Sequence, residues 1–171
     1  MDPRAGADTV AAGLAPVLAG SGVVVESVVI HPAGKRRLVR VTVARDVSGL
    51  DPADETSPVE PLSMDEVAAA TRSVSAAIDE MTVLGQAPYT LEVSSPGVEQ
   101  PLTTPDAFRR NVGRLVSLTR DDDTTTEGRI AGVGPAGVRL DSPDATPVPF
   151  ERVRRARVQV EFTRPDDAKE S

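Results

Sequence analysis

Residues 89–102 read YTLEVSSPGVEQPL, and this stretch divides the chain into two parts. Tyr89, Leu91 and Val93 alternate with polar residues, which is the period-two pattern of a strand with one apolar face. Proline lacks a ladder donor and glycine permits a positive φ, so the chain must leave the strand where these residues follow it. We therefore predict a strand and then an interdomain turn made by Ser94, Ser95, Pro96 and Gly97.

The segment before this strand begins with a predicted helix and a hairpin. Apolar residues at helical spacing predict a helix over residues 9–19, with Asp8 as its cap. Runs rich in valine at 23–30 and 38–45 predict two strands, and a turn at 31–34 joins them into a hairpin.

A second helix follows a loop. Residues 46–62 are acidic and rich in proline, and we expect them to form a loop. Ser63 and Glu66 then match a capping box, in which each side chain bonds the backbone amide of the other residue. Apolar residues at spacings of three and four, beginning with Met64, predict a helix that ends near Gly85.

The order helix, strand, strand, helix, strand predicts a two-layer α+β domain over residues 1–100. This α-β-β-α-β order resembles the topology of small KH-type RNA-binding domains, although no GxxG loop is present in it. A shared topology does not by itself establish a function.

The pattern changes after Pro101. A short helix is predicted near 105–110, a single helical turn at 150–153, and brief strands elsewhere at near-regular spacing. Such spacing is typical of a small β-barrel, here over residues 101–164, and residues 165–171 are expected to form a flexible tail. The predicted strands are 114–120, 127–133, 137–140, 146–150 and 157–162.

The run LEVSSPGVEQPL, together with Phe108 and the NVGR that begins at Asn111, resembles the ribosome maturation factor family RimP. In that family a strand that ends in this way leads to a PL pair and then to a small barrel domain. The resemblance therefore implies an SH3-like barrel for the second domain. One departure from the family is Gln100, because members usually carry a basic residue directly before the PL pair.

The resemblance also implies a function. It implies a non-catalytic, cytoplasmic assembly factor that binds the immature small (30S) ribosomal subunit and acts by differential affinity for an immature conformation. The implied contacts are the RNA of that subunit and a basic small-subunit ribosomal protein, the one numbered twelve. We expect a monomer that uses no cofactor.

Composition excludes several classes of function. With one histidine and no cysteine, the chain has almost nothing to build a His-paired nucleophile or a thiolate metal site. It has no P-loop and no GxGxxG motif, and a calcium-binding loop starting at Asp121 would need an acid where Gly132 stands. We therefore predict no catalytic, cofactor-binding or metal-ligating residues. No run of about 18 apolar residues is present and the start lacks a signal-peptide pattern, so we expect a cytoplasmic protein without membrane contact.

The charge is unevenly distributed. The net charge is −7, and it arises entirely before residue 101, whereas residues 101–164 carry nine acidic and eleven basic residues. Such a division suits a partner that offers both signs, as a particle of RNA and basic protein does. The alternative is that the acidic surface only maintains solubility.

Three clusters of charge are candidates for contact with a partner. The acidic one is either a solvated loop or a surface for a basic protein segment, and the arginine-rich one is either a phosphate or partner contact or a set of rim pairs. The third, in the hairpin, is either a solvated loop or a phosphate contact. The acidic cluster is Asp121, Asp122 and Asp123; the arginine cluster is Arg152, Arg154, Arg155 and Arg157; the hairpin cluster is Lys35, Arg36 and Arg37.

A second function stays open at this point, namely a free-standing RNA-binding module that regulates translation. Proteins that bind single-stranded RNA usually stack bases on several aromatic side chains. This chain has one tyrosine, three phenylalanines and no tryptophan, so composition counts against that alternative.

Overall fold

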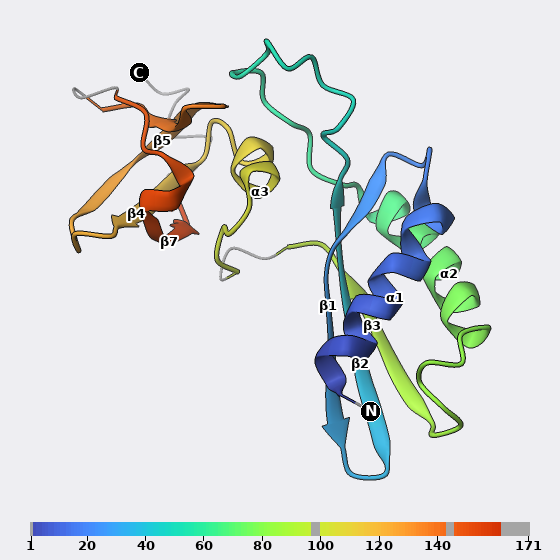
Figure 1. Cartoon of the computed structure of the whole chain (residues 1–171). Helices are drawn as coiled ribbons and strands as arrows, with labels where there is room; N and C mark the ends of the chain where they lie inside the picture. The colour runs from blue at the N-terminus through green and yellow to red at the C-terminus, as the bar shows by residue number, and fades with distance from the viewer. Residues whose placement is uncertain (1, 97–99, 143–145, 162–171) are drawn as a thin grey trace. The chain divides into compact units, whose positions relative to one another are not determined.

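A computed structural model describes residues 2–96, 100–142 and 146–161 of the chain. The described residues divide into two compact units, which are drawn in Figure 1. The first unit contains residues 1–48 and 60–96, and the second contains residues 49–59 together with the chain after Pro96. The predicted tail at 165–171 and Phe162 lie outside the described residues.

The first unit has the predicted α-β-β-α-β order. Its central strand β2 pairs antiparallel with β1 and parallel with β3, which gives the sheet order β1-β2-β3. Helices α1 and α2 pack against the same sheet (Figure 1). The elements are α1 (Pro3–Leu18), β1 (Val23–Ala33), β2 (Arg36–Arg45), α2 (Met64–Asp79) and β3 (Tyr89–Ser94).

The core of the first unit lies between this sheet and the two helices. Val39, Val41 and Val43 alternate along β2 and are fully buried, as the period of two predicts. Leu14 of α1 and Ile78 of α2 are buried in the same cluster. On the opposite face of the sheet, Arg40 of β2 and Glu92 of β3 form an exposed ion pair, whereas Thr42 and Ala44 of β2 are buried.

Three boundaries in the first unit differ most from the prediction. Helix α1 starts at Pro3 with Asp2 as its cap, not at Thr9, because proline is favourable in the first turn. Strand β1 continues to Ala33, since it is an edge strand and tolerates Pro32. Helix α2 ends at Asp79 and not near Gly85, and the chain after it turns back to bury Leu84.

The prediction that Met64 belongs to the buried apolar stripe of α2 is also wrong. Met64 is 89% exposed, although its position fits the helical spacing. It is the first residue of the helix, beside the Ser63 cap, and lies outside the packed length of the helix. The buried residues of the helix are Ala70 together with Val74 and Ile78, which both belong to the predicted stripe.

The second unit contains a four-stranded antiparallel sheet with the order β6-β5-β4-β7. No closed barrel forms within the described residues. The strand predicted over 146–150 is reduced to a single bridge between Val138 and Val148. The elements are α3 (Pro105–Arg110), β4 (Leu115–Arg120), β5 (Thr125–Gly134), β6 (Gly137–Leu140), the 3-10 turn η1 (Phe150–Arg152) and β7 (Val153–Val158).

The predicted helical turn before the last strand is present as η1, but β7 starts at Val153, four residues before the predicted position 157. Ala156 of β7 is fully buried, whereas Val160, which lies within the predicted strand 157–162, is 53% exposed and lies beyond the observed strand. Leu118, Ile130 and other buried residues from α3 and the four strands complete a separate core.

Candidate partner-binding surface

The acidic cluster forms the turn between β4 and β5. Asp123 adopts a left-handed backbone with φ of 66°, and its amide donates to the carbonyl of Arg120 at 3.0 Å. Asp is among the few non-glycine residues that tolerate this conformation. Asp122 accepts a hydrogen bond from the Thr124 amide at 3.0 Å. The triplet therefore has a local structural role, since its side chains and backbone close a tight three-residue hairpin loop.

The pKa of Asp122 lies below its usual value. The main cause is the hydrogen bond from the Thr124 hydroxyl, followed by the bond from the Thr124 amide, and the nearby Arg152 guanidinium adds to the effect. The carboxylate therefore keeps its negative charge under mildly acidic conditions.

The structure brings the acidic cluster and half of the arginine cluster together. Arg152 lies 3.3 Å from a carboxylate oxygen of Asp121 and 3.9 Å from one of Asp122. Arg154 forms an ion pair with Asp123. All these side chains are at least half exposed, and exposed pairs of this kind contribute little to stability. Two of the four arginines thus already have acidic neighbours.

The other two arginines of the cluster have a different setting. Arg155 and Arg157 alternate with the buried Ala156 along β7, so they project from the outer face of the sheet. They stand opposite Thr119 and Ser117 of β4 in the strand register. No hydrogen bond or ion pair engages either guanidinium in the part of the chain that the structure describes.

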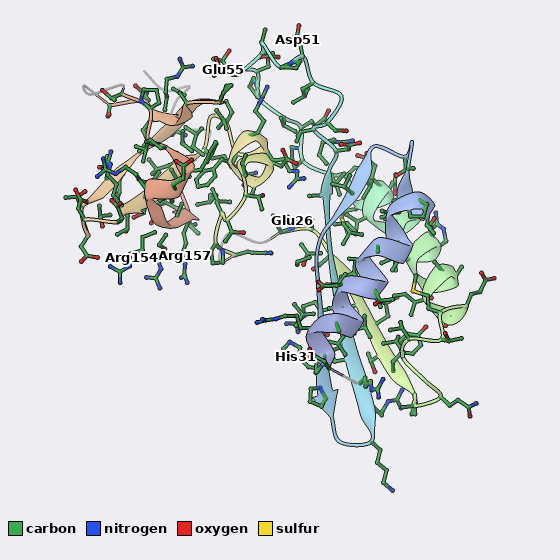
Figure 2. All side chains as sticks on the ribbon, viewed as in Figure 1. Glu26, His31, Asp51, Glu55, Arg154 and Arg157 are labelled. Carbon is green, nitrogen blue, oxygen red and sulfur yellow. The ribbon has the colours of Figure 1, made fainter. Side chains whose placement is uncertain are left out.

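Strand β7 is an edge strand, and a bulge on it explains the two settings. The register shifts between Thr119 and Arg120, which pair with Arg155 and Val153, so Arg154 is left as the additional residue. A bulge re-aims one side chain. It directs Arg154 to the Asp123 turn, while Arg157 keeps its place on the outward face; both extend outward in Figure 2.

The three residues of the hairpin cluster also differ in their surroundings. Lys35 lies in the two-residue turn and Arg36 opens β2, and both are exposed. Arg37 instead donates to the carbonyl of Leu84 at 2.7 Å, and its amide donates to Pro88. Arg37 therefore fastens the chain segment between α2 and β3.

The predicted interdomain turn is only partly described. Ser94 ends β3, and Ser95 and Pro96 follow it with exposed side chains. Gly97 lies outside the described residues. The first unit ends at Pro96.

One structural feature is absent from the sequence-based prediction. Residues 49–59, which we call the strap, lie in the first half of the chain but pack on the second unit. Arg109 of α3 donates to the carbonyl of Ser57 at 2.5 Å and to that of Asp54 at 3.3 Å. The amide of Val133 donates to the carbonyl of Glu55 at 2.9 Å. Glycines at alternate positions of β5, Gly132 and Gly134, are the only sequence signal for this close approach.

No group of histidine, aspartate and glutamate side chains among the described residues is arranged to hold a metal ion. None of the described helices combines the length and the apolar character that crossing a bilayer requires.

Comparison with known proteins gives consistent matches. Residues 13–99 match the family described as the RimP N-terminal domain. A protein of Kineococcus radiotolerans named ribosome maturation factor RimP is 42% identical over 174 residues, which cover 90% of this chain and 79% of that protein. A protein of Frankia casuarinae with the same name is 38% identical over 168 residues, covering 89% of this chain and 58% of that longer protein.

Proposed function

The chain belongs to the RimP family of ribosome maturation factors, and from this membership we propose that it binds the immature small (30S) ribosomal subunit and favours its maturation. It is a maturation factor and not an enzyme. The proposed action is a population shift: the protein binds one conformation of the particle more tightly than another, and no bond is made or broken.

The observation that carries the proposed contact with RNA is the setting of Arg155 and Arg157. Both guanidinium groups project from an edge strand beside the hydroxyl side chains of Thr119 and Ser117. Arginine binds phosphate through two parallel hydrogen bonds, and hydroxyl groups contribute further phosphate contacts. We place the main contact with small-subunit ribosomal RNA on this pair, in preference to Arg152 and Arg154, whose charge the acidic turn offsets.

The acidic turn is the proposed contact for a basic small-subunit ribosomal protein, the one numbered twelve. The Asp121 and Asp123 side chains remain 56% and 74% exposed, so each retains room for a second cationic partner. A basic segment would there replace Arg152 and Arg154, and those arginines would become available to phosphate. Charge complementarity of this kind speeds association and selects the partner more than it adds affinity.

The remaining parts of the proposal concern fold type and location. The 3-10 turn before β7 and the bridge between Val138 and Val148 support an SH3-like barrel for the second unit. The α-β-β-α-β order supports a KH-like first unit. We further propose that the protein acts as a monomer in the cytoplasm.

Fractionation of ribosomal particles tests the proposed function. The tagged protein should sediment with free small subunits and be absent from whole ribosomes and polysomes. Loss of the gene should lower the ratio of mature small to large subunits. Presence on polysomes would favour the RNA-binding regulator considered from sequence, and unchanged subunit ratios would contradict the proposal.

A further inference from the structure

The strap is attached to the second unit by backbone contacts. Two of its carbonyl oxygens, those of Asp54 and Ser57, accept from the Arg109 guanidinium, and a third, that of Glu55, accepts from the Val133 amide. The Asp54 carboxylate lies 3.6 Å from the same guanidinium. Figure 2 labels Glu55, on the attached part of the strap, and Asp51, farther out on it.

The strap supplies the hydrogen-bond acceptors of a buried arginine, Arg109. This arginine is only 7% exposed, and arginine is rarely buried to that extent without partners. A guanidinium without acceptors would be costly, so water or the oxygen atoms of a ligand must replace the acceptors of the strap when it leaves. Among the described residues, every hydrogen-bond and ion-pair partner of the Arg109 guanidinium belongs to the strap.

Two glycines of β5 leave room for the strap, because neither has a side chain. A Cβ atom at Gly134 would collide with the carboxyl group of Glu55 and lie 3.2 Å from its Cγ. A Cβ atom at Gly132 would lie 3.2 Å from the Glu55 carbonyl oxygen and would collide with the guanidinium of Arg139. A second arginine therefore stands beside the place where the strap is bound.

We propose that Arg109, Arg139 and the Val133 amide form a second phosphate-binding site, which the strap occupies in the free protein and which the RNA of the immature subunit takes over. This proposal rests on the function proposed above. The site presents only donors and receives only oxygen atoms, and a phosphodiester offers oxygen acceptors with a negative charge. The strap carries three carboxylates and no basic residue, so one anionic segment replaces another.

Release of the strap requires few new partners for its own polar groups. Asp51 accepts from the Ala53 amide at 2.9 Å, and Asp54 accepts from the Ser57 amide at 3.0 Å. These turns are internal to the strap and remain intact when it leaves. The contacts that are exchanged are those to Arg109 and Val133, which the incoming phosphate provides again.

A disulfide lock tests the proposal, because the native chain has no cysteine. The double variant Glu55→Cys with Gly134→Cys places two thiols at the observed close approach, and oxidation should hold the strap in place. The oxidised form should bind purified small-subunit ribosomal RNA about tenfold more weakly than the reduced form, since charged hydrogen bonds to phosphate are lost. Each single cysteine variant, treated with the same oxidant, serves as the control.

A second variant tests the contribution of the negative charge of the strap without a crosslink. Replacing the strap carboxylates by amides (Asp51→Asn, Asp54→Asn and Glu55→Gln) should tighten RNA binding, because the displaced segment is no longer held by ion pairing. The matched control carries the same change in net charge on exposed sites of the first unit, Asp8→Asn, Asp65→Asn and Glu80→Gln. The strap variant should bind RNA more tightly than this control.

The outcomes separate the two proposals. The proposed phosphate site beneath the strap would be contradicted if the oxidised and reduced forms of the double cysteine variant bound RNA equally. It would also be contradicted if the strap variant and its control gained the same RNA affinity. Either result would leave the proposed function intact. Displacement of the strap by an acidic peptide but not by RNA would overturn the assignment to phosphate. If the wild-type protein bound neither immature subunits nor their RNA, the proposed function itself would fail.

Discussion

At the scale of single residues, Arg45 connects three segments of the first unit. From the end of β2 it binds both carboxylate oxygens of Glu66, at 2.6 and 2.8 Å, and it also donates to the carbonyl of Glu60 at 3.1 Å. Glu66 at the same time accepts from the Ser63 amide, as the capping box predicts. The sequence predicts the cap because its spacing is local, but not the arginine, which lies 21 residues away.

This arrangement predicts a pH dependence of stability. The hydrogen bond from Arg45 and those from Ser63 lower the pKa of Glu66 from 4.5 to about 2. A carboxyl group whose pKa falls on folding contributes stability above its unfolded pKa and loses it as the pH drops toward the folded value. Glu66→Gln should therefore flatten the decline in the free energy of unfolding between pH 5 and about 2.

Denaturant titrations at several pH values check this, with the exposed Glu80→Gln as the control. A decline of the same steepness in Glu66→Gln and in the wild type would show that the Arg45 pair does not form in solution.

Asp123 gives a second prediction at this scale. Its φ of 66° is costly for most side chains, by about 1–2 kcal/mol. Asp123→Gly should thus leave thermal stability nearly unchanged, whereas Asp123→Ala should lower it, by about 1 kcal/mol. Both variants remove the ion pair with Arg154, so their difference isolates the backbone. Equal melting temperatures would contradict the assigned turn.

At the scale of elements, strand β7 shows where sequence patterns fail. The alternation of apolar and polar residues is interrupted at Arg154, which is the bulged residue. A period of two therefore does not reveal that the strand begins at Val153. The regular strands β2 and β3 are predicted closely because nothing interrupts their alternation. The sequence shows the four arginines of this cluster, but it does not show the bulge that divides them.

This division predicts unequal effects of arginine substitutions on RNA binding. Arg155→Ala with Arg157→Ala should lower affinity and reduce the slope of log affinity against log salt by about one to two, since each lost phosphate contact removes about 0.7–0.9. Arg152→Ala with Arg154→Ala should change the slope less, because the Asp121–Asp123 turn already offsets these charges. Binding titrations over a salt series measure both, and the reverse order would contradict the assignment.

At the scale of the whole molecule, the strap explains why domain boundaries are hard to read from sequence. The two units are not two continuous stretches, because residues 49–59 leave the first unit, pack on the second and are followed by the return of the chain at Glu60. The contacts responsible join residues 52 and 55 positions apart. Composition indicates a loop there, but no local pattern indicates what that loop contacts.

Hydrogen exchange tests this division. Leu118 is fully buried in the second unit, and Leu118→Ala should destabilise that unit by about 2–5 kcal/mol. The Val133 amide, which donates to the Glu55 carbonyl of the strap, should then lose protection together with the other amides of β4 and β5. Leu14→Ala, in the core of the first unit, serves as the counterpart and should spare the Val133 amide. Loss of protection at Val133 with Leu14→Ala alone would contradict the division.

Equilibrium binding of the purified protein to immature and to mature small subunits, at one salt concentration, tests most directly whether it works by preferring the unfinished particle. A shift in population requires a difference in affinity between the two states. We predict clearly tighter binding to the immature subunit, with neither particle altered covalently. Equal affinity for both particles would contradict the account, however tight that binding was.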